Sequence, residues 1–545
     1  MTTSRNQHLQ LAAGAVRVPE TQNLSSVKLW CEYAIWGLLF YDDQSPWLTV
    51  VEALHICFHR KVQGEAVFTA ASSATSMEHE TVTYRLRLNN ELRHMIFRDR
   101  EVIRIANGQS ADEKARWQTW LDTVSRDYAG LELGYLQDEF ETFGEMARSV
   151  ELLRTAEIEA QSAKRWTSRH ILPLGPEMLF ADVNDKNALD RKFMRRTGEM
   201  LYLMLNRALL RDKLGHLIET RLLSAGSPWN RLAKRVGGSA ASSVGDTHIG
   251  YLPMPNSTSY NRLAEDWLAL LSLRNIPVEN LLDPLERVSG LMQILYILER
   301  AQDSIGDNVP VPPFFLDLLG APGNNPIRKL SANQFRRHRS MPVEAMGAFI
   351  DAFAASDQWN TVVSSAAGAK ESMDLLAKRF LWKPSLTPNP DRMPSPEEQL
   401  AELRTQAQNS KGHSITSTFS NHCKHIGMLR AQRSSGTWYA PSDAFLEAMV
   451  LANVTTPMEF GDFLNRLMTR YNIVIGPEEV RIAFNLKTSA LPAPLADLKD
   501  NERRLEDRLR VLGFLDRKSD DCAFVINPFH DTMTTTSGVT QFVHA

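Results

Sequence analysis

The sequence predicts a mainly α-helical fold with small β-hairpins, in which a large helical N-terminal region precedes two related C-terminal units. Three observations lead to this prediction. Apolar residues recur at helical spacing over most of the chain, and strand-like alternation is confined to short stretches. In addition, two C-terminal segments share one apolar pattern at a constant offset, which indicates a repeated structural unit.

The composition limits the classes of protein to which the chain can belong. Its 545 residues are enough for about three or four ordinary domains. Apolar residues make up 43% and charged residues 23%, which is typical of a soluble globular protein. The net charge of −3 excludes a polycation that coats nucleic acid with its whole surface. Any nucleic-acid binding must therefore come from a local patch.

Cysteine usage and hydropathy indicate the compartment. Cys31, Cys57, Cys423 and Cys522 are widely scattered, which argues against a disulfide framework and favours a reducing cytoplasm. The N-terminal segment MTTSRNQHLQLAAGAVRVPE has no apolar run long enough for a signal peptide. No stretch of about 18 uninterrupted apolar residues occurs, so a transmembrane helix is not expected. We therefore expect a cytoplasmic protein without a membrane partner.

The N-terminal part is expected to be helical over most of its length. After a flexible leader at residues 1–23, residues 24–382 are predicted to be a mostly helical region, which starts with an apolar core helix at Leu24–Phe40. Thr81–Leu88 alternates apolar side chains with Thr and Arg, which predicts one strand with an exposed face. The small, polar segment Gly237–Gly245 is expected to be a mobile loop.

Two segments are candidate boundaries. Residues 308–326 are rich in Pro, Gly and Asn and are expected to separate two subdomains of the helical region. Residues 383–396 carry five prolines, which excludes a regular helix and predicts a linker. Ser395, Pro396 and Glu398 then form a strong helix start. Serine caps the helix, proline occupies its first turn, and glutamate reaches back to the cap.

Two successive units are expected after the linker. The first spans residues 397–452 and the second residues 453–530, and a disordered tail is expected at residues 531–545. Each unit should contain a helix that runs directly into a β-hairpin. The expected elements are helices at Glu397–Gln408, Ile415–Ile426 and Ser442–Leu451 with a hairpin at Met428–Tyr439, and helices at Pro457–Tyr471, Pro477–Phe484 and Leu498–Leu512 with a hairpin at Phe514–Ile526.

The two helix–hairpin segments, Phe419–Ser442 and Leu505–Pro528, align without a gap at an offset of 86 residues. Residue identity is low, but the apolar positions coincide along both segments. Gly427 aligns with Gly513, at the place where a helix C-cap favours a residue with positive φ. The alignment predicts two copies of one fold.

A helix that runs into a β-hairpin resembles the end of a winged-helix domain, where the recognition helix comes first and the wing second. That family mostly binds DNA, so the resemblance implies DNA-binding modules in the C-terminal part of the chain. In overall style the chain also loosely resembles accessory subunits of bacterial anti-phage defence and restriction systems, whose helical bodies carry winged-helix modules. Because one fold supports many functions, the residues must indicate what each copy does.

The first copy has the charge expected of a DNA reader. No Asp or Glu occurs between Leu403 and Ser442, and the expected recognition helix begins with small hydrogen-bonding residues that suit phosphates and base edges. The basic segment Phe335–Arg339 is a second candidate phosphate-binding strip. The expected DNA contacts are Thr416, Ser417, Thr418, Ser420, Asn421, Lys424, Arg430 and Arg433, together with Arg336, Arg337 and Arg339.

The second copy carries acids among its basic residues. Glu502, Glu506 and Asp507 lie on its helix, and Asp516 and Asp520 lie on its hairpin, where carboxylates would repel phosphate. We therefore expect a protein contact or a purely structural role for this copy. For the first copy, the alternative to DNA binding is an ordinary solvated surface that lacks acids.

No motif assigns a catalytic residue, a cofactor or a metal ligand. The sequence lacks a Walker A motif, an HExxH motif, a G-x-S-x-G elbow and paired CxxC motifs. The histidines at His55 and His59, and the pair His422 and His425, are interpreted as structural. A dispersed active site in the helical region stays open as an alternative.

The sequence thus predicts a non-enzymatic DNA-binding or scaffolding subunit of a multi-protein bacterial system, with anti-phage defence as the suggested setting. Its expected partners are DNA and other protein subunits of the same system. One alternative is a docking subunit similar to the kleisins of condensin-like complexes, in which winged helices grip partner proteins. The other alternative is an enzyme with an unrecognised site in the helical region.

Overall fold

The structure is a computed structural model that describes most of the chain. It is mainly helical, with 61% helix and 9% strand in small sheets, which confirms the predicted fold class. The described residues are 15–16, 26–37, 41, 44–69, 81–99, 101–108, 112–128, 130–158, 165–238, 242–306, 311–320, 325–385, 393–409, 414–433, 436–484, 491–519 and 522–530. Most of the predicted leader, the centre of the 383–396 linker and the predicted tail lie outside these residues.

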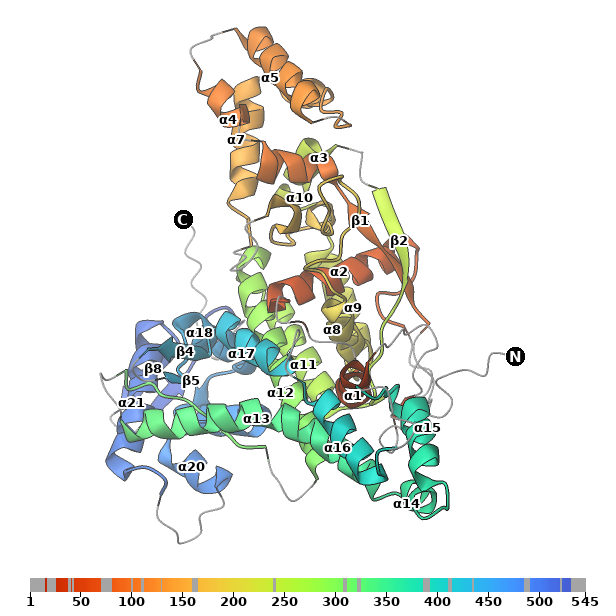
Figure 1. The fold of residues 1–545 in the computed structure, drawn as a ribbon. Helices are drawn as coiled ribbons and strands as arrows, with labels where there is room; N and C mark the ends of the chain where they lie inside the picture. The colour runs from red at the N-terminus through yellow and green to blue at the C-terminus, as the bar shows by residue number, and fades with distance from the viewer. Residues whose placement is uncertain are drawn as a thin grey trace.

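The N-terminal region forms an upright body that ends in a lobe at the top of Figure 1. Inside the lobe, the rings of Trp117, Trp120 and Phe143 meet edge to face at centroid distances of 5.1 to 5.9 Å. This aromatic cluster joins the two long helices of the lobe. Its elements are α3 (Asn90–Arg93), the π-helix η1 (His94–Arg98), α4 (Glu101–Ala106), α5 (Glu113–Asp127), α6 (Leu136–Glu139) and α7 (Phe143–Arg154).

A two-stranded antiparallel ribbon runs along the body below the lobe, where β1 (Thr83–Leu88) pairs with β2 (Ser242–His248). The predicted strand at Thr81–Leu88 is confirmed, and Tyr84, Leu86 and Leu88 are its buried side chains. The predicted mobile loop Gly237–Gly245 is wrong from Ser242 onwards. Pairing with β1 makes that small, polar segment a strand, which its own residues do not favour.

One helix, α12 (Leu282–Ile305), is the central element of the molecule. Helices α2 and α11, which precede it in the chain, pack on it, and so do α13, α17 and α18, which follow it. Its middle, residues 288–298, is buried on all sides, since apolar residues recur there on every face. The other helices of the body are α1 (Val27–Trp36), α2 (Pro46–Val62), η2 (Trp166–Ser168), η3 (Pro176–Met178), α8 (Thr197–Asn206), α9 (Arg211–Leu217), η4 (Ile218–Leu222), α10 (Pro228–Gly237), α11 (Thr258–Ser272) and η5 (Val278–Leu281).

Below the body lies the longest helix, α13 (Pro326–Ala354), which carries Pro342 in its interior. Helices α14 (Asp357–Val363), α15 (Gly368–Phe380) and α16 (Pro396–Ala407) follow it and gather at its C-terminal end. The predicted capping box at the start of α16 is confirmed, since the Glu398 amide donates to Ser395 Oγ and the Ser395 amide donates to Glu398. Helix α16 packs on α1, α13 and α15.

The C-terminal part contains the two expected helix–hairpin segments. Their helices and hairpins coincide with the predicted ones to within a few residues at each end. Figure 1 places them side by side at the left of the molecule. The elements are α17 (Ile415–His425), β4 (Leu429–Gln432), β5 (Gly436–Tyr439), α18 (Asp443–Asn453), β6 (Met458–Glu459), α19 (Phe460–Tyr471), β7 (Ile473–Val474), α20 (Pro477–Ala483), α21 (Leu495–Val511), β8 (Leu515–Ser519) and β9 (Cys522–Val525).

Backbone hydrogen bonds confirm that the two segments are copies. Gly427 and Gly513 have φ values of 79° and 80°, and each ends its helix in the same left-handed turn. The amide after each glycine donates five residues back, from Met428 to the Cys423 carbonyl at 2.9 Å and from Phe514 to the Leu509 carbonyl at 2.8 Å. The hairpin registers agree over their first three pairs, because Leu429 pairs with Tyr439 and, 86 residues later, Leu515 pairs with Val525. Beyond Arg517 the second hairpin has a register shift that the first hairpin lacks.

Each copy also has a third extended segment beside its hairpin. In the second copy, β6 pairs with β9 and precedes α19, so the strand order is β6–β9–β8. In the first copy, the amide of Asp317 donates to the carbonyl of Tyr439 on β5 at 2.8 Å, and α13 follows. In chain order, α13 thus follows the extended segment of the first copy as α19 follows that of the second, and α14, α15 and α16 lie between α13 and α17.

The apolar core is continuous between the halves of the chain. One cluster of buried side chains runs from Val16 to Val525, and a small second cluster surrounds Phe315, Ile327 and Val474. The domain limits at 382, 452 and 530 stay predictions, because the packing does not test them. Among the described residues, no helix is both long and apolar enough to cross a membrane.

Candidate nucleic-acid interface

Helix α17 has one apolar face and one polar face. Phe419 and Cys423 are fully buried, and the helix packs on α12 and α13. The opposite face carries Ser417, Ser420 and Lys424, of which Lys424 is exposed and the serines are half-buried. Their spacing of three and four residues places these side chains in one outward stripe, to which Asn421 also belongs.

One predicted DNA contact on α17 is not at the surface. Thr418 is fully buried, and its hydroxyl lies 3.3 Å from the Ser414 carbonyl. We therefore leave Thr418 out of the candidate surface. Thr416 is half-buried, and Ser420 Oγ donates to its carbonyl at 3.0 Å.

A second basic stripe lies on α13. Lys329, Arg336 and Arg339 are exposed on this helix, whereas Phe335 and His338 between them are buried. Lys329 is not among the predicted DNA contacts, although its spacing of seven residues from Arg336 places both on one helix face. Arg337 differs from its neighbours, because it is half-buried and forms an ion pair with Glu344, with Nη1 2.6 Å from Oε2.

The structure brings α13 and α17 together. The Thr416 hydroxyl lies 3.5 Å from the Arg339 carbonyl, across a sequence separation of 77 residues. Beneath this contact, the rings of Phe335 and Phe419 stack at a centroid distance of 6.3 Å. Two basic segments that were predicted separately thus belong to one surface.

The hairpin β4–β5 extends this surface. Arg430 and Arg433 are exposed on it, and Tyr439 at its base is fixed to α13, because the Tyr439 amide donates to Ser331 Oγ at 2.9 Å. The guanidinium of Arg328 lies 4.4 Å from the ring centre of Trp438, which is buried. The hairpin therefore presents its arginines from a fixed position relative to α13.

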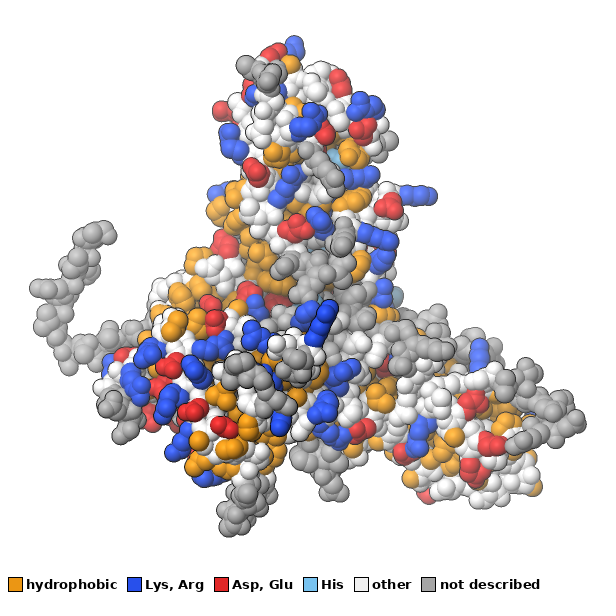
Figure 2. Space-filling view, turned by 60° about the vertical axis from the view of Figure 1, so that its left-hand side comes forward, with side chains coloured by type: hydrophobic (Ala, Val, Ile, Leu, Met, Phe, Trp, Pro, Cys, Tyr) orange, Lys and Arg blue, Asp and Glu red, His pale blue; other side chains and the backbone are white. Residues whose placement is uncertain are grey.

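The charge of this surface is not neutralised locally. Within the described residues, none of its six exposed cations forms an ion pair; they are Lys329, Arg336, Arg339, Lys424, Arg430 and Arg433. We call this set the cation surface. Figure 2 shows Lys and Arg side chains gathered over the lower part of the molecule on the side that carries the two C-terminal copies.

The second copy differs in this respect. Four of its basic side chains form ion pairs of 2.5 to 3.5 Å, three with acids of the second copy and one with an acid on α18. The pairs are Arg508 with Asp443, Arg510 with Asp507, Arg517 with Glu506, and Lys518 with Asp516. Its positive charge is therefore largely neutralised before any partner arrives.

Two buried histidines support the cation surface from behind. His338 bonds through Nδ1 to the Tyr439 hydroxyl at 2.6 Å and through Nε2 to the Pro312 carbonyl at 2.8 Å. His422 Nε2 lies 3.0 Å from Gln293 Oε1 on α12. Burial lowers the pKa of His338 to about 4 and that of His422 to about 3, so both are neutral at pH 7.

In the described part of the chain, no group of His, Cys, Asp and Glu side chains could hold a metal ion.

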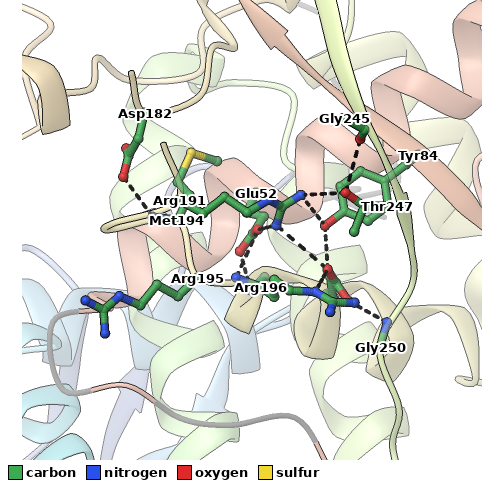
Figure 3. Close-up of polar contacts among 12 residues, drawn as sticks. Glu52, Tyr84, Asp182, Arg191, Met194, Arg195, Arg196, Gly245, Thr247 and Gly250 are labelled. Atoms are coloured by element: carbon green, nitrogen blue, oxygen red, sulfur yellow. Dashed lines mark hydrogen bonds and ion pairs between the residues drawn. The ribbon is translucent and has the colours of Figure 1, made fainter. Parts of the chain in front are cut away.

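A second polar cluster, which sequence reasoning missed, lies inside the N-terminal body (Figure 3). Glu52 on α2 and Glu199 on α8 are fully buried. Arg191 joins Glu52 to the ribbon, with Nη1 3.1 Å from Glu52 Oε1 and Nη2 3.1 Å from Thr247 Oγ1. The Tyr84 hydroxyl donates to Glu199 Oε1 at 2.5 Å and accepts from Arg191 at 3.2 Å.

Every charged group in this cluster has a partner of opposite charge. Arg196 binds Glu199 with Nε 2.6 Å from Oε1, and the Gly198 amide donates to Glu52 at 3.0 Å. Because the carboxylates are buried and fully bonded, the cluster acts as a structural link between α2, α8 and the ribbon. Its members are far apart in the sequence, so no local pattern could have revealed it.

The function must be inferred from the chain's own residues. Comparisons of the chain with protein-family models, with curated proteins and with solved structures find no match.

Proposed function

We propose that the protein is a non-enzymatic DNA-binding and scaffolding subunit of a multi-protein bacterial system, with anti-phage defence as its suggested setting. In this proposal both copies are winged-helix modules, and the first one reads DNA. The observation that carries the proposal is the cation surface, on which six exposed cations lack ion-pair partners among the described residues. Exposed cations without ion-pair partners can bind phosphate directly, because no existing ion pair has to be broken first.

The surface has separate groups for the two kinds of DNA contact. The small polar residues on α17 suit hydrogen bonds to base edges in a groove. The cations of α13 and the hairpin suit phosphates on either side of that groove. In this proposal α17 contacts the bases, while α13 and the hairpin contact the DNA backbone.

Double-stranded DNA is the preferred ligand in this proposal. Single-strand binders stack bases on exposed aromatic rings. The aromatic side chains of this region, Phe335, Phe419, Trp438 and Tyr439, are all at most 3% exposed. The described part of the surface therefore lacks a stacking platform, whereas its cations suit the regular phosphates of a duplex.

We assign the second copy to protein docking. Its paired charges leave little free positive charge for phosphate, and they suit a polar contact with another subunit of the system.

A cytoplasmic location is also part of the proposal. It is supported by the four cysteines, none of which forms a disulfide.

The test is fluorescence anisotropy with the full-length chain and a labelled duplex of about 30 base pairs at several salt concentrations. If all six cations contact phosphate, log K should fall with log salt with a slope of about −5. Lys424→Glu/Arg430→Glu/Arg433→Glu should weaken binding strongly and reduce the slope by about 3. The matched control is Arg508→Glu/Arg510→Glu/Lys518→Glu in the second copy, which should leave both quantities unchanged.

The possible outcomes separate the alternatives. If only the control variant lost affinity, the second copy would be the reader. If neither variant changed a measurable affinity, DNA binding by this surface would be wrong. If the wild-type protein bound no duplex, a docking role for both copies would replace the proposal.

A further inference from the structure

The upper lobe contains a polar cavity of about 870 Å³. Its lining residues are far in sequence from those of the cation surface. It lies between the end of α5, the segment η1–α4 and residues 165–169. Five arginines and three acids line it together with aromatic rings. The arginines are Arg98, Arg104, Arg126, Arg165 and Arg169.

Arg98 is held between two aromatic rings in this cavity. Its guanidinium carbon lies 4.6 Å from the ring centre of Tyr128 and 4.7 Å from that of Trp166. Within the described residues, Arg98 forms no ion pair. Stacking fixes the plane of a guanidinium and leaves the N–H groups at its edge available to an anion.

Two arginines, Arg93 and Arg154, hold the walls of the cavity in place. Arg93 is fully buried and donates to the carbonyls of Trp166, Thr167 and Arg169 at 3.2, 2.5 and 3.1 Å. Arg154 donates to the carbonyl of Met95 at 2.9 Å within the π-helix. Because π-helical turns occur often at functional sites, a π-helix that carries Arg98 is a second sign of a binding site. The cavity is therefore built before a ligand enters.

The charges of the cavity do not cancel. Glu101 is paired with Arg104, and Asp127 is paired with Arg126 at 2.8 Å. These pairs leave Arg98 and Arg165 without an acid within ion-pair distance among the described residues, and Asp185 is the remaining acid of the lining. Arg169 lies 3.5 Å from Glu157, outside the lining. Over the described lining, the remaining charge is therefore positive.

We infer that this cavity binds the phosphate groups of a nucleotide, either free or at the end of a nucleic-acid strand. Guanidinium groups match phosphate oxygens with two parallel hydrogen bonds. The aromatic rings of the lining offer apolar contacts to a base, and the volume lies in the range of about 300–1,000 Å³ that is typical of small-ligand pockets. This inference does not depend on the function proposed for the cation surface.

The test is calorimetric titration of the full-length chain with ATP, AMP and adenosine, and with a short oligonucleotide that carries either a 5′-phosphate or a 5′-hydroxyl. We expect binding that strengthens with the number of phosphates and is lost with adenosine. Arg98→Gln and Arg165→Gln should each weaken binding at least about ten-fold, because each removes a charged donor. Arg503→Gln, on α21, removes an exposed arginine elsewhere and should have no effect.

The arms of the titration distinguish the two sources of phosphate. Tighter binding of ATP assigns a free nucleotide, and tighter binding of the 5′-phosphorylated oligonucleotide assigns a strand end. Equal affinity for adenosine and ATP would overturn the inference, as would full affinity in both variants. Arg165 is exposed, so its variant tests the site even if loss of the stacked Arg98 unfolds the lobe.

Discussion

Glu286 is a single residue that we expect to make the stability of the fold depend on pH. It is buried inside α12, and among the described residues its Oε1 has no hydrogen-bond partner. Burial raises the pKa of Glu286 to about 8, although Arg287 nearby favours its charged form. The folded state therefore holds a proton that the unfolded state releases above pH 4 to 5.

The sign of the effect follows from linkage. Because its folded pKa is raised, Glu286 contributes stability that is complete below the unfolded pKa and lost as the pH rises through about 8. Glu286→Gln should thus leave the melting temperature nearly unchanged at pH 5 and raise it at pH 9, by an amount that corresponds to a few kcal/mol. Thermal melts across this range test the prediction, with the exposed Glu151→Gln as control. Parallel pH profiles for wild type and Glu286→Gln would contradict it.

Tyr84 provides a second test at the residue scale. Its hydroxyl is the donor that lies between buried Glu199 and Arg191, so Tyr84→Phe should cost about 1–3 kcal/mol in the free energy of unfolding. The matched control is Tyr251→Phe, which removes a hydroxyl that donates to the neutral carbonyl of Val16 at 2.7 Å. That change should cost about 0.5–1.5 kcal/mol. Urea unfolding of both variants measures the difference, and a smaller loss for Tyr84→Phe would show that the buried cluster does not act as a link.

At the scale of elements, the two copies offer a matched pair of glycines. A Cβ at Gly427 would lie 2.1 Å from Ser442 Oγ, whereas a Cβ at Gly513 would have nothing within 4 Å. Both have positive φ, so Gly513→Ala should cost about 1–3 kcal/mol from backbone strain alone. Gly427→Ala should cost more, because the clash disturbs the serine that caps α18. Chemical denaturation gives both values, and equal losses would contradict this reading of the packing.

Elements that depend on local signals could be predicted from the sequence, and those that depend on a distant partner could not. Three features depend only on residues that are neighbours in the sequence, and all three are confirmed. They are the glycine that ends α17, the capping box of α16 and the alternation in β1. Strand β2 could not be predicted, because its partner lies about 160 residues earlier in the chain. For the same reason, the sequence could not show that α13 packs on the hairpin of the first copy.

The candidate site follows the same rule. The acid-free segment and the basic strip on α13 were found by composition, but their contact depends on the fold. Burial of Thr418 and the pairing of Arg337 with Glu344 also required the structure. The stacked Arg98 left no signal in the sequence, since Tyr128 and Trp166 lie about 30 or more residues away from it.

At the scale of the whole molecule, the C-terminal copies do not stand apart from the helical body. Helix α17 packs on α12 and α13, which precede the proline-rich linker. A fragment that begins at Ser395 lacks both helices and should expose Phe419 and its apolar neighbours. We therefore expect this fragment to show no cooperative thermal transition by circular dichroism, whereas the full-length chain melts cooperatively. A sharp transition in the fragment would show that a C-terminal copy folds without α12 and α13.

The constant offset between the two copies has a practical consequence. From the helix to Arg517 the two backbones correspond position by position, so Lys424 has its counterpart at Arg510 and Arg430 has its counterpart at Asp516. Over this stretch, side chains can be exchanged between the copies without a change in turn geometry or strand register. The molecule thus contains a second copy of the same backbone, on which the charges of the first copy can be rebuilt one at a time.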